Sequence, residues 1–307
     1  MELRVLRYYL AVAREQSISG AANALHITQP ALSRQLMELE QELGAKLLIR
    51  GSRGKPVALT EEGKRLRLRA EELVTLADRT VEEFTEQEAE ISGMVYIGAG
   101  ETEGMRLLAN AAARLRKRHP RLRFHLYSGI AEDVTERLDQ GLLDFGVLVG
   151  ESALQKYDYL PLPASDVWGV LVRADHPLAA KDRVRAKDLR SEPLIVSRQA
   201  LQNNELSGWL GKKPEELNVV ASYNLLLNAV YFVEAGLGTA LCIDGLADTS
   251  RTDLCFRPLD PPLCGQLRLV WKKHQIFSKA AKLFLEELQT ELRRDERSLE
   301  RDNPCFT

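Results

Sequence analysis

The sequence contains few cysteines and few aromatic residues, and it has no long apolar run. Aromatic residues make up 6% of the 307 positions. The four cysteines (Cys242, Cys255, Cys264 and Cys305) show no CxxC spacing, which argues against a zinc ribbon or a disulfide framework and favours reduced thiols. No segment approaches the roughly 20 apolar residues of a membrane helix, and charged residues interrupt the amino terminus where a signal peptide is apolar. We therefore expect a cytoplasmic protein without a membrane partner.

Catalytic, cofactor and metal motifs are also missing. The chain has no G-x-S-x-G, H-E-x-x-H or P-loop sequence, and its five histidines stand in unrelated contexts. Gly98, Gly100 and Gly104 follow a strand-like segment, but their spacing is one residue too long for the dinucleotide motif G-x-G-x-x-G. No acidic residue ends the next predicted strand either. The sequence predicts a protein that is not an enzyme, with no catalytic residue, metal site or cofactor.

What is present is the composition of an ordinary globular protein, with 45% hydrophobic and 28% charged residues and a length that suggests two domains. The net charge of −2 hides an uneven distribution. Residues 1–70 carry 12 Lys or Arg against 7 Asp or Glu, and residues 71–90 carry one against eight. The other basic and acidic residues cancel, with 29 of each. A nucleic-acid contact is therefore to be sought in the amino-terminal quarter.

The amino-terminal segment has the pattern of short helices around a tight turn. Ser17 is a suitable N-cap for a helix over 18–25, and a second helix over 29–43 is ended by Gly44. A helix-turn-helix requires small residues where its first helix meets the second, and the alanines of the first helix meet this requirement. It also requires polar residues at the exposed start of the second helix that can reach base edges, and these are present as well. The apolar stripes alone would also fit any small three-helix domain.

Two strand-like pieces, 46–50 and 57–59, follow this motif and flank a tip with two glycines and two cations. Beyond them, 60–91 lacks proline and has no glycine after Gly63, which predicts one long helix. Its apolar positions recur at heptad spacing: Leu66, Ala70, Leu73, Ala77, Thr80 and Phe84. This stripe predicts a partner helix, and the alternative is an amphipathic helix that packs on the carboxy-terminal domain of its own chain.

After Gly93 the pattern changes to strands alternating with helices, which predicts two α/β subdomains. The predicted strands are 94–98, 122–127, 143–149, 167–172, 194–196, 219–221, 238–243 and 266–271, and the predicted helices are 103–118, 132–140, 204–210, 225–234 and 278–294. The number of strands fits better if the tail returns to the first subdomain. The chain would then cross between subdomains near 160–163 and near 263–265.

The segments "SISGAANALHITQPALSRQLMELEQELGAKLLIR" and "LTEEGKRL" resemble the DNA-binding domain of the LysR-type transcriptional regulators. The resemblance implies a winged helix-turn-helix with a recognition helix and a basic wing. Glutamine suits adenine, and arginine suits guanine or phosphate. The expected DNA contacts are Thr28, Gln29, Pro30, Ser33, Arg34, Arg50, Arg53 and Lys55.

The stretches "IGAGETEGMRLLANAAARLRKRHP", "LDQGLLDFGVLV" and "VEAGLGTAL" are similar to landmarks of the same family. They imply two periplasmic-binding-protein-like subdomains with an effector in the cleft between them. The expected lining is Gly100, Glu101, Thr102, Ser128, Val149, Ser197, Arg198 and Asn224. Gly100 stands where the family often has a hydroxyl residue that contacts an effector carboxylate. Glu101 and Glu103 add negative charge, which argues against a strongly anionic ligand unless Arg198 dominates.

Together these features predict a mixed α+β and α/β protein. A winged helix-turn-helix over 1–60 precedes a dimerisation helix over 61–91 and an effector-binding domain over 92–307. Subdomain I would comprise about 92–162 and 266–295, and subdomain II 163–265. The expected partners are double-stranded promoter DNA, further copies of the chain in a homodimer or homotetramer, a small-molecule effector and RNA polymerase. The alternative is a solute-binding or catalytic α/β protein with an incidental basic head.

Overall fold

The computed structural model describes residues 1–49, 56–85, 91–150, 154–202, 205–211, 213–250 and 253–295. Contacts between residues divide the chain into two units, Met1–Thr85 and Glu86–Thr307. Within the described residues, no helix has the length and apolar character needed to cross a membrane.

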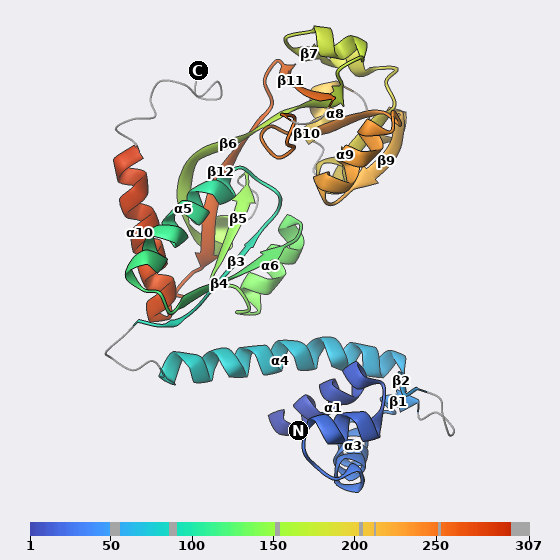
Figure 1. Ribbon diagram of the computed structural model, residues 1–307, viewed down its shortest axis with the longest axis vertical. Helices are drawn as coiled ribbons and strands as arrows, with labels where there is room; N and C mark the ends of the chain where they lie inside the picture. The colour runs from blue at the N-terminus through green and yellow to red at the C-terminus, as the bar shows by residue number, and fades with distance from the viewer. Residues whose placement is uncertain are drawn as a thin grey trace. The chain divides into compact units, whose positions relative to one another are not determined.

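The first unit is a helical domain with a two-stranded antiparallel ribbon (Figure 1). Its elements are α1 (Leu3–Glu15), α2 (Ile18–Ala24), α3 (Gln29–Leu43), β1 (Leu48–Ile49), β2 (Ala58–Leu59) and α4 (Glu61–Thr85). Ser17 Oγ accepts a hydrogen bond from the N–H of Gly20, which caps α2 as expected. Gly44 ends α3 in the left-handed region, with φ of 63°.

Helix α4 contributes to the core of the first unit, whereas the heptad stripe was predicted to pack against a partner helix. Leu66 and Ala70 belong to that stripe, yet both pack against the core of their own unit, where α4 contacts α1. Leu73, by contrast, is exposed. Leu73 follows Leu66 by seven residues, which is nearly two full turns, so it lies on the same side of α4 as the residues that pack on the core and yet remains exposed. The side chain of Phe84 and residues 86–90 lie outside the described part.

The second unit consists of two lobes, each with a parallel sheet core (Figure 1). The strands are β3 (Gly93–Ala99), β4 (Leu122–Ser128), β5 (Phe145–Val149), β6 (Tyr157–Arg173), β7 (Val184–Arg185), β8 (Leu194–Ser197), β9 (Val219–Tyr223), β10 (Thr239–Ile243), β11 (Leu254–Asp260) and β12 (Cys264–Lys272). The helices are α5 (Gly104–Arg118), α6 (Ala131–Asp139), α7 (Arg198–Gln202), α8 (Glu205–Leu210), α9 (Leu226–Glu234) and α10 (Lys279–Asp295). Two strands, β7 and β11, were not predicted from the sequence.

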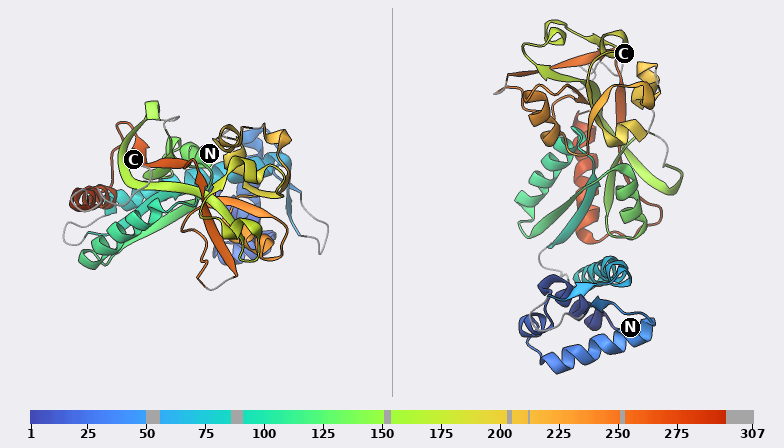
Figure 2. Two further views of the ribbon diagram at one scale, coloured as in Figure 1. Left: turned by 90° about the horizontal axis from the view of Figure 1, so that it is seen from above. Right: turned by 90° about the vertical axis from the view of Figure 1, so that its right-hand side faces the viewer.

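The order of strands along the sheet is β4-β3-β5-β12-β6-β10-β8-β9. Strand β12 lies between β5 and β6 and is antiparallel to both, so the tail does return to the first lobe. Strand β6 pairs with β12 from Tyr157 to Val167 and with β10 from Trp168 to Leu171. The first crossing therefore lies at 167–168, later than predicted, because β6 is one continuous strand of 17 residues. The right-hand view in Figure 2 shows β6 and β12 connecting the lobes.

Helices cover both faces of each sheet and provide the cores. In the first lobe, α5 and α10 pack on one face around Phe145 and Phe284, and α6 packs on the other face around Val134 (Figure 1). In the second lobe, α9 packs beside Cys242, which is a buried free thiol. Cys255 is also free, but Cys264 is disulfide-bonded, so the expectation of reduced thiols is wrong at Cys264.

Candidate functional site

The start of α3 is a polar, solvent-facing helix end. Thr28, Gln29 and Pro30 are exposed, and Thr28 occupies the N-cap position without using its side chain as a cap. The first N–H groups of α3 therefore have no side-chain cap and can bind an external acceptor such as a phosphate. Ser33 lies one turn further on and is half-buried. These residues form one surface, as a recognition helix requires.

Arg34 is exposed on the same helix and pairs with Glu38, with 3.0 Å between Nε and Oε1. The pair is four residues apart on the helix surface, where such contacts are weak. The guanidinium can therefore exchange this carboxylate for a base edge or a phosphate at little cost. The remaining predicted DNA contacts, Arg50, Arg53 and Lys55, lie outside the described residues.

A buried carboxylate fixes the ribbon next to α3. Glu40 is 4% exposed, and its Oε1 accepts hydrogen bonds from the N–H groups of Leu47 at 2.8 Å and Leu48 at 3.2 Å. Burial alone would raise the pKa of Glu40, but these donors, together with Lys46, lower it below its ordinary value. Glu40 therefore ties the recognition helix to β1, a role that was not predicted from the sequence.

The second unit contains a cavity of about 280 Å³ between its two lobes. Its lining comes from the carboxyl ends of parallel strands, namely β3, β4 and β5 in the first lobe and β8, β9 and β10 in the second. Loops at these ends can change without disturbing the sheets, and ligands of open α/β folds bind there. The sheet topology thus places the cavity.

Most of the residues predicted to bind an effector line this cavity. The predicted residues found there are Gly100, Glu101, Thr102, Ser128, Val149, Ser197 and Asn224. Arg198 is the exception, because it is exposed at the start of α7 and does not line the cavity. Position 100 has open space around it, since the nearest atoms to a side chain there would be Gly129 O at 3.7 Å and Gln199 Oε1 at 3.9 Å.

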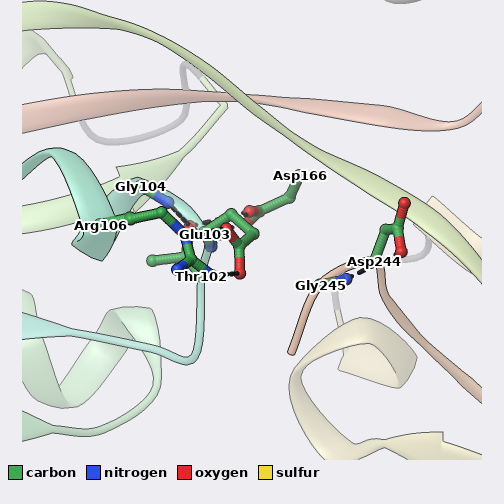
Figure 3. Close-up of polar contacts among 7 residues, drawn as sticks. All are labelled: Thr102, Glu103, Gly104, Arg106, Asp166, Asp244 and Gly245. Carbon is green, nitrogen blue, oxygen red and sulfur yellow. Dashed lines mark hydrogen bonds and ion pairs between the residues drawn. The ribbon is translucent and has the colours of Figure 1, made fainter. Parts of the chain in front are cut away.

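Asp166 and Trp168 of β6 also line the cavity and were not predicted. Asp166 is 1% exposed, and its Oδ1 accepts hydrogen bonds from Thr102 Oγ1 at 2.8 Å and from the N–H of Glu103 at 3.3 Å. Figure 3 shows Asp166 beside Thr102 and Glu103 at the beginning of α5. Burial raises the pKa of Asp166 to about 6, and the two donors offset only part of this effect.

Glu101 connects the two lobes across the cavity. Its Oε2 accepts a hydrogen bond of 2.6 Å from the N–H of Leu226, the first residue of α9. Burial raises the pKa of Glu101, and the bond to Leu226 opposes that shift. The neighbouring Glu103 approaches the second lobe as well, since a Cβ at Gly245 would lie 2.8 Å from Glu103 Oε1. This loop of the first lobe therefore contacts the second lobe directly.

Both units match models of known protein families. The bacterial regulatory helix-turn-helix protein, lysR family, matches residues 3–64, and the LysR substrate binding domain matches residues 88–293. The HTH-type transcriptional regulator BenM of Acinetobacter baylyi is 33% identical over 273 residues, which are 85% of this chain and 86% of BenM. The Hca operon transcriptional activator HcaR of Escherichia coli is 28% identical over 284 residues, covering 90% and 93% of the two chains.

Solved structures show the same architecture over nearly the whole chain. CbnR, a LysR family transcriptional regulator, superimposes with a TM-score of 0.74 at 19% identity, covering 95% of this chain and 99% of CbnR. CbnR complexed with its target DNA gives a TM-score of 0.72 at 18% identity, covering 94% and 99% of the two chains. Full-length BenM superimposes with a TM-score of 0.56 at 28% identity, covering 98% of this chain and 100% of the BenM chain.

These features define a protein with a helix-turn-helix unit joined to a two-lobed effector-binding unit. The chain belongs to the LysR family of transcriptional regulators. These two relatives are named as a transcriptional regulator and a transcriptional activator.

Proposed function

We propose that the chain regulates transcription by placing the start of α3 in the major groove of promoter DNA, and that a small effector in the inter-lobe cavity controls this binding. The observation that carries the proposal is the exposed start of α3, where the side chain of Thr28 does not cap the helix. Free N–H groups there suit a phosphate, and the side chains of Gln29 and Arg34 suit base edges. The wing residues Arg50, Arg53 and Lys55 would add phosphate or minor-groove contacts.

Selection from a random pool of double-stranded DNA, followed by affinity measurements across salt concentrations, tests this proposal. We expect a specific site and a steep fall of affinity with salt, because phosphate contacts release counterions. Arg34→Ala should cost about 1–3 kcal/mol and relax specificity at one base pair if the guanidinium contacts a base edge. Gln29→Ala should act in the same way, and Gln41→Ala at the exposed far end of α3 is the matched control. Unchanged affinity in both test variants would refute the assignment of α3.

The effector would contact Gly100, Glu101, Thr102, Ser128, Val149, Ser197 and Asn224, which the cavity brings together. Arg198 is not part of this proposal. Because the cavity lies between two lobes, a ligand that binds one arrangement of the lobes better than another shifts the balance between them. That shift would change the placement of the DNA-binding units and hence transcription, with RNA polymerase as the further partner.

The chain would act as a homodimer, or as a homotetramer built from dimers, with a second copy packed against α4. Exposed apolar side chains on this helix support the proposal: Leu68, Leu73, Leu76 and Val81. Two copies would present two α3 helices to the half-sites of a palindrome. We further propose that the protein acts in the cytoplasm, without a cofactor and without catalysis.

A further inference from the structure

Among the described residues, the lining of the inter-lobe cavity is acidic and contains no basic group. Three carboxylate residues line it: Glu101, Asp133 and Asp166. Within the described part of the chain, no Lys, Arg or His contributes to the lining. Arg198, the one cation expected there, is exposed elsewhere. An anionic ligand would therefore enter this cavity against the local charge and would find no cation to pair with.

Carboxylates of the protein lie at the starts of three helices beside the cavity, and at two of them they accept a backbone N–H. Glu101 accepts the N–H of Leu226 at the start of α9, and Asp166 accepts the N–H of Glu103 just before α5. The first turn of α6 carries Glu132 and Asp133. The negative charge at these three helix starts offsets the partial positive charge that would otherwise favour an anionic ligand there.

Asp166 carries a carboxylate oxygen that is not used by the protein. Its Oδ1 accepts two hydrogen bonds, whereas its Oδ2 is buried and has no hydrogen-bond partner among the described residues. A buried carboxylate oxygen without a partner is costly, and that cost is recovered when a donor reaches it. Asp166 lines the cavity, and a donor group on a ligand bound next to it would supply the hydrogen bond that Oδ2 lacks.

The rest of the lining determines the shape of a suitable ligand. Apolar side chains cover much of the wall: Val147, Leu148, Val149, Trp168, Ile243 and Leu246. They suit an apolar body next to one charged head group. A metal ion is a poor fit, because no group of three or more His, Cys, Asp or Glu residues in the described chain could hold one.

We propose that the effector of this regulator is an organic ammonium ion with an apolar body, held by hydrogen bonds from its N–H groups to the free oxygen of Asp166. This inference rests on the proposed function and specifies the ligand of the same site. It is a non-covalent contact in which the ammonium group gives Oδ2 a partner that the described residues do not supply. Carboxylate and phosphate ligands are disfavoured by the same geometry.

Binding of matched ligands to the full-length protein tests the assignment. The probes are 2-phenylethylamine, 2-phenylethanol and phenylacetate, with hexylamine, hexanol and hexanoate as an unbranched series. Each series keeps the apolar body and changes the head group from cation to neutral to anion. At neutral pH, calorimetry or thermal shift should show that the amine binds at least about tenfold more tightly than the alcohol, and that the carboxylate binds least.

Asp166→Asn provides the decisive variant. Oδ1 is held by two donors, from Thr102 and Glu103, so the asparagine amide nitrogen must take the place of Oδ2. The cavity then offers a donor in place of an acceptor. Amine affinity should fall by about tenfold or more, and the carboxylate should bind better than it does to the wild type. Asp158→Asn is the control, because Asp158 lies exposed on the same strand and away from the cavity.

Several results would overturn the inference. It fails if the carboxylates bind wild-type protein more tightly than the amines, if Asp166→Asn binds amines as the wild type does, or if no amine of either series binds. Should the variant not fold, the wild type still decides, because amine affinity must drop at acid pH as Asp166 becomes protonated. Specific DNA binding in the salt titration is measured separately, so its loss would refute the proposed function and not this ligand assignment.

Discussion

At the scale of single residues, Asp166 makes the stability of the second unit depend on pH. Its pKa is about 6 in the folded chain, against an ordinary value of 3.8, because burial disfavours the charged form. Between these values the folded chain holds a proton that the unfolded chain has lost. Stability therefore falls as pH rises from about 4 to about 6, by on the order of 3 kcal/mol, and then levels off.

Urea unfolding of the full chain across this pH range checks the prediction. Asp166→Asn should lack the decrease, so the variant should gain stability relative to the wild type as pH rises through about 6. Asp158→Asn, on the same strand but exposed, should follow the wild-type profile. Parallel profiles for all three proteins would mean that Asp166 does not titrate in this range.

Glu40 makes the stability of the first unit depend on pH in the opposite direction to Asp166. Glu40→Ala leaves the N–H groups of Leu47 and Leu48 without their acceptor, so we expect a loss of about 1–3 kcal/mol per unsatisfied group. Because the folded pKa of Glu40 lies below 4.5, its contribution is present above that value and is lost as pH falls through the folded pKa.

The measurement for Glu40 is urea unfolding at neutral pH combined with DNA affinity. Glu42→Ala is the control, since Glu42 lies exposed near the end of the same helix and pairs only at the surface. We expect the Glu40 variant to lose both stability and DNA affinity, because this anchor holds β1 beside the recognition helix. A stable variant with normal DNA affinity would contradict the role assigned to Glu40.

At the scale of secondary structure elements, the sequence predicts those that local chemistry determines. Ser17 and Gly44 mark helix ends by capping, and the helices they delimit are confirmed. Strand β11 and the first half of β6 were missed, because their pairing is decided by partners far away in the chain. The cavity residue Asp166 was missed for the same reason. It lies inside β6, close to the crossing between the lobes, which was predicted too early in the chain. The signal in the sequence that could have identified Asp166 is its position, since it is an acidic residue directly before the apolar run 167–172.

Helix α4 leads to a prediction about assembly. Leu66 and Ala70 are used within the unit, so the apolar side chains of α4 that remain for a second copy are the exposed ones, among them Leu73 and Leu76. Replacing both leucines by lysine should weaken the dimer by about tenfold or more, since it places charge into an apolar seam. Sedimentation velocity of the full chain measures this change. Thr75→Lys is the control, because Thr75 lies exposed on another face of α4.

That experiment tests whether the exposed leucines of α4 form the contact between the two copies. A double variant that sediments as the wild type does would show that α4 does not hold the copies together. If Thr75→Lys dissociates the dimer equally, added charge anywhere on the helix would explain the effect, and the exposed leucine face would lose its special role.

At the scale of the whole molecule, the two lobes of the second unit are joined both by the chain itself and by a hydrogen bond to a carboxylate. Strands β6 and β12 join them covalently, and the carboxylate of Glu101 joins them through the N–H of Leu226. A regulator needs two arrangements of similar free energy, so that a ligand of modest affinity can shift the balance. A single hydrogen bond to a charged group, worth roughly 1.5–3 kcal/mol, is of the right size for such a contact.

Glu101→Ala should therefore loosen the second lobe without unfolding either lobe. We expect the Leu226 amide to exchange with solvent about tenfold faster or more, since the variant removes its acceptor. Amides in the buried strands β5 and β10 should keep their protection, because their hydrogen bonds lie within each sheet. Glu132→Ala, at an exposed position of α6, is the control. Unchanged exchange at Leu226 would show that Glu101 does not connect the lobes in solution, whereas faster exchange throughout the unit would show that it supports the fold itself.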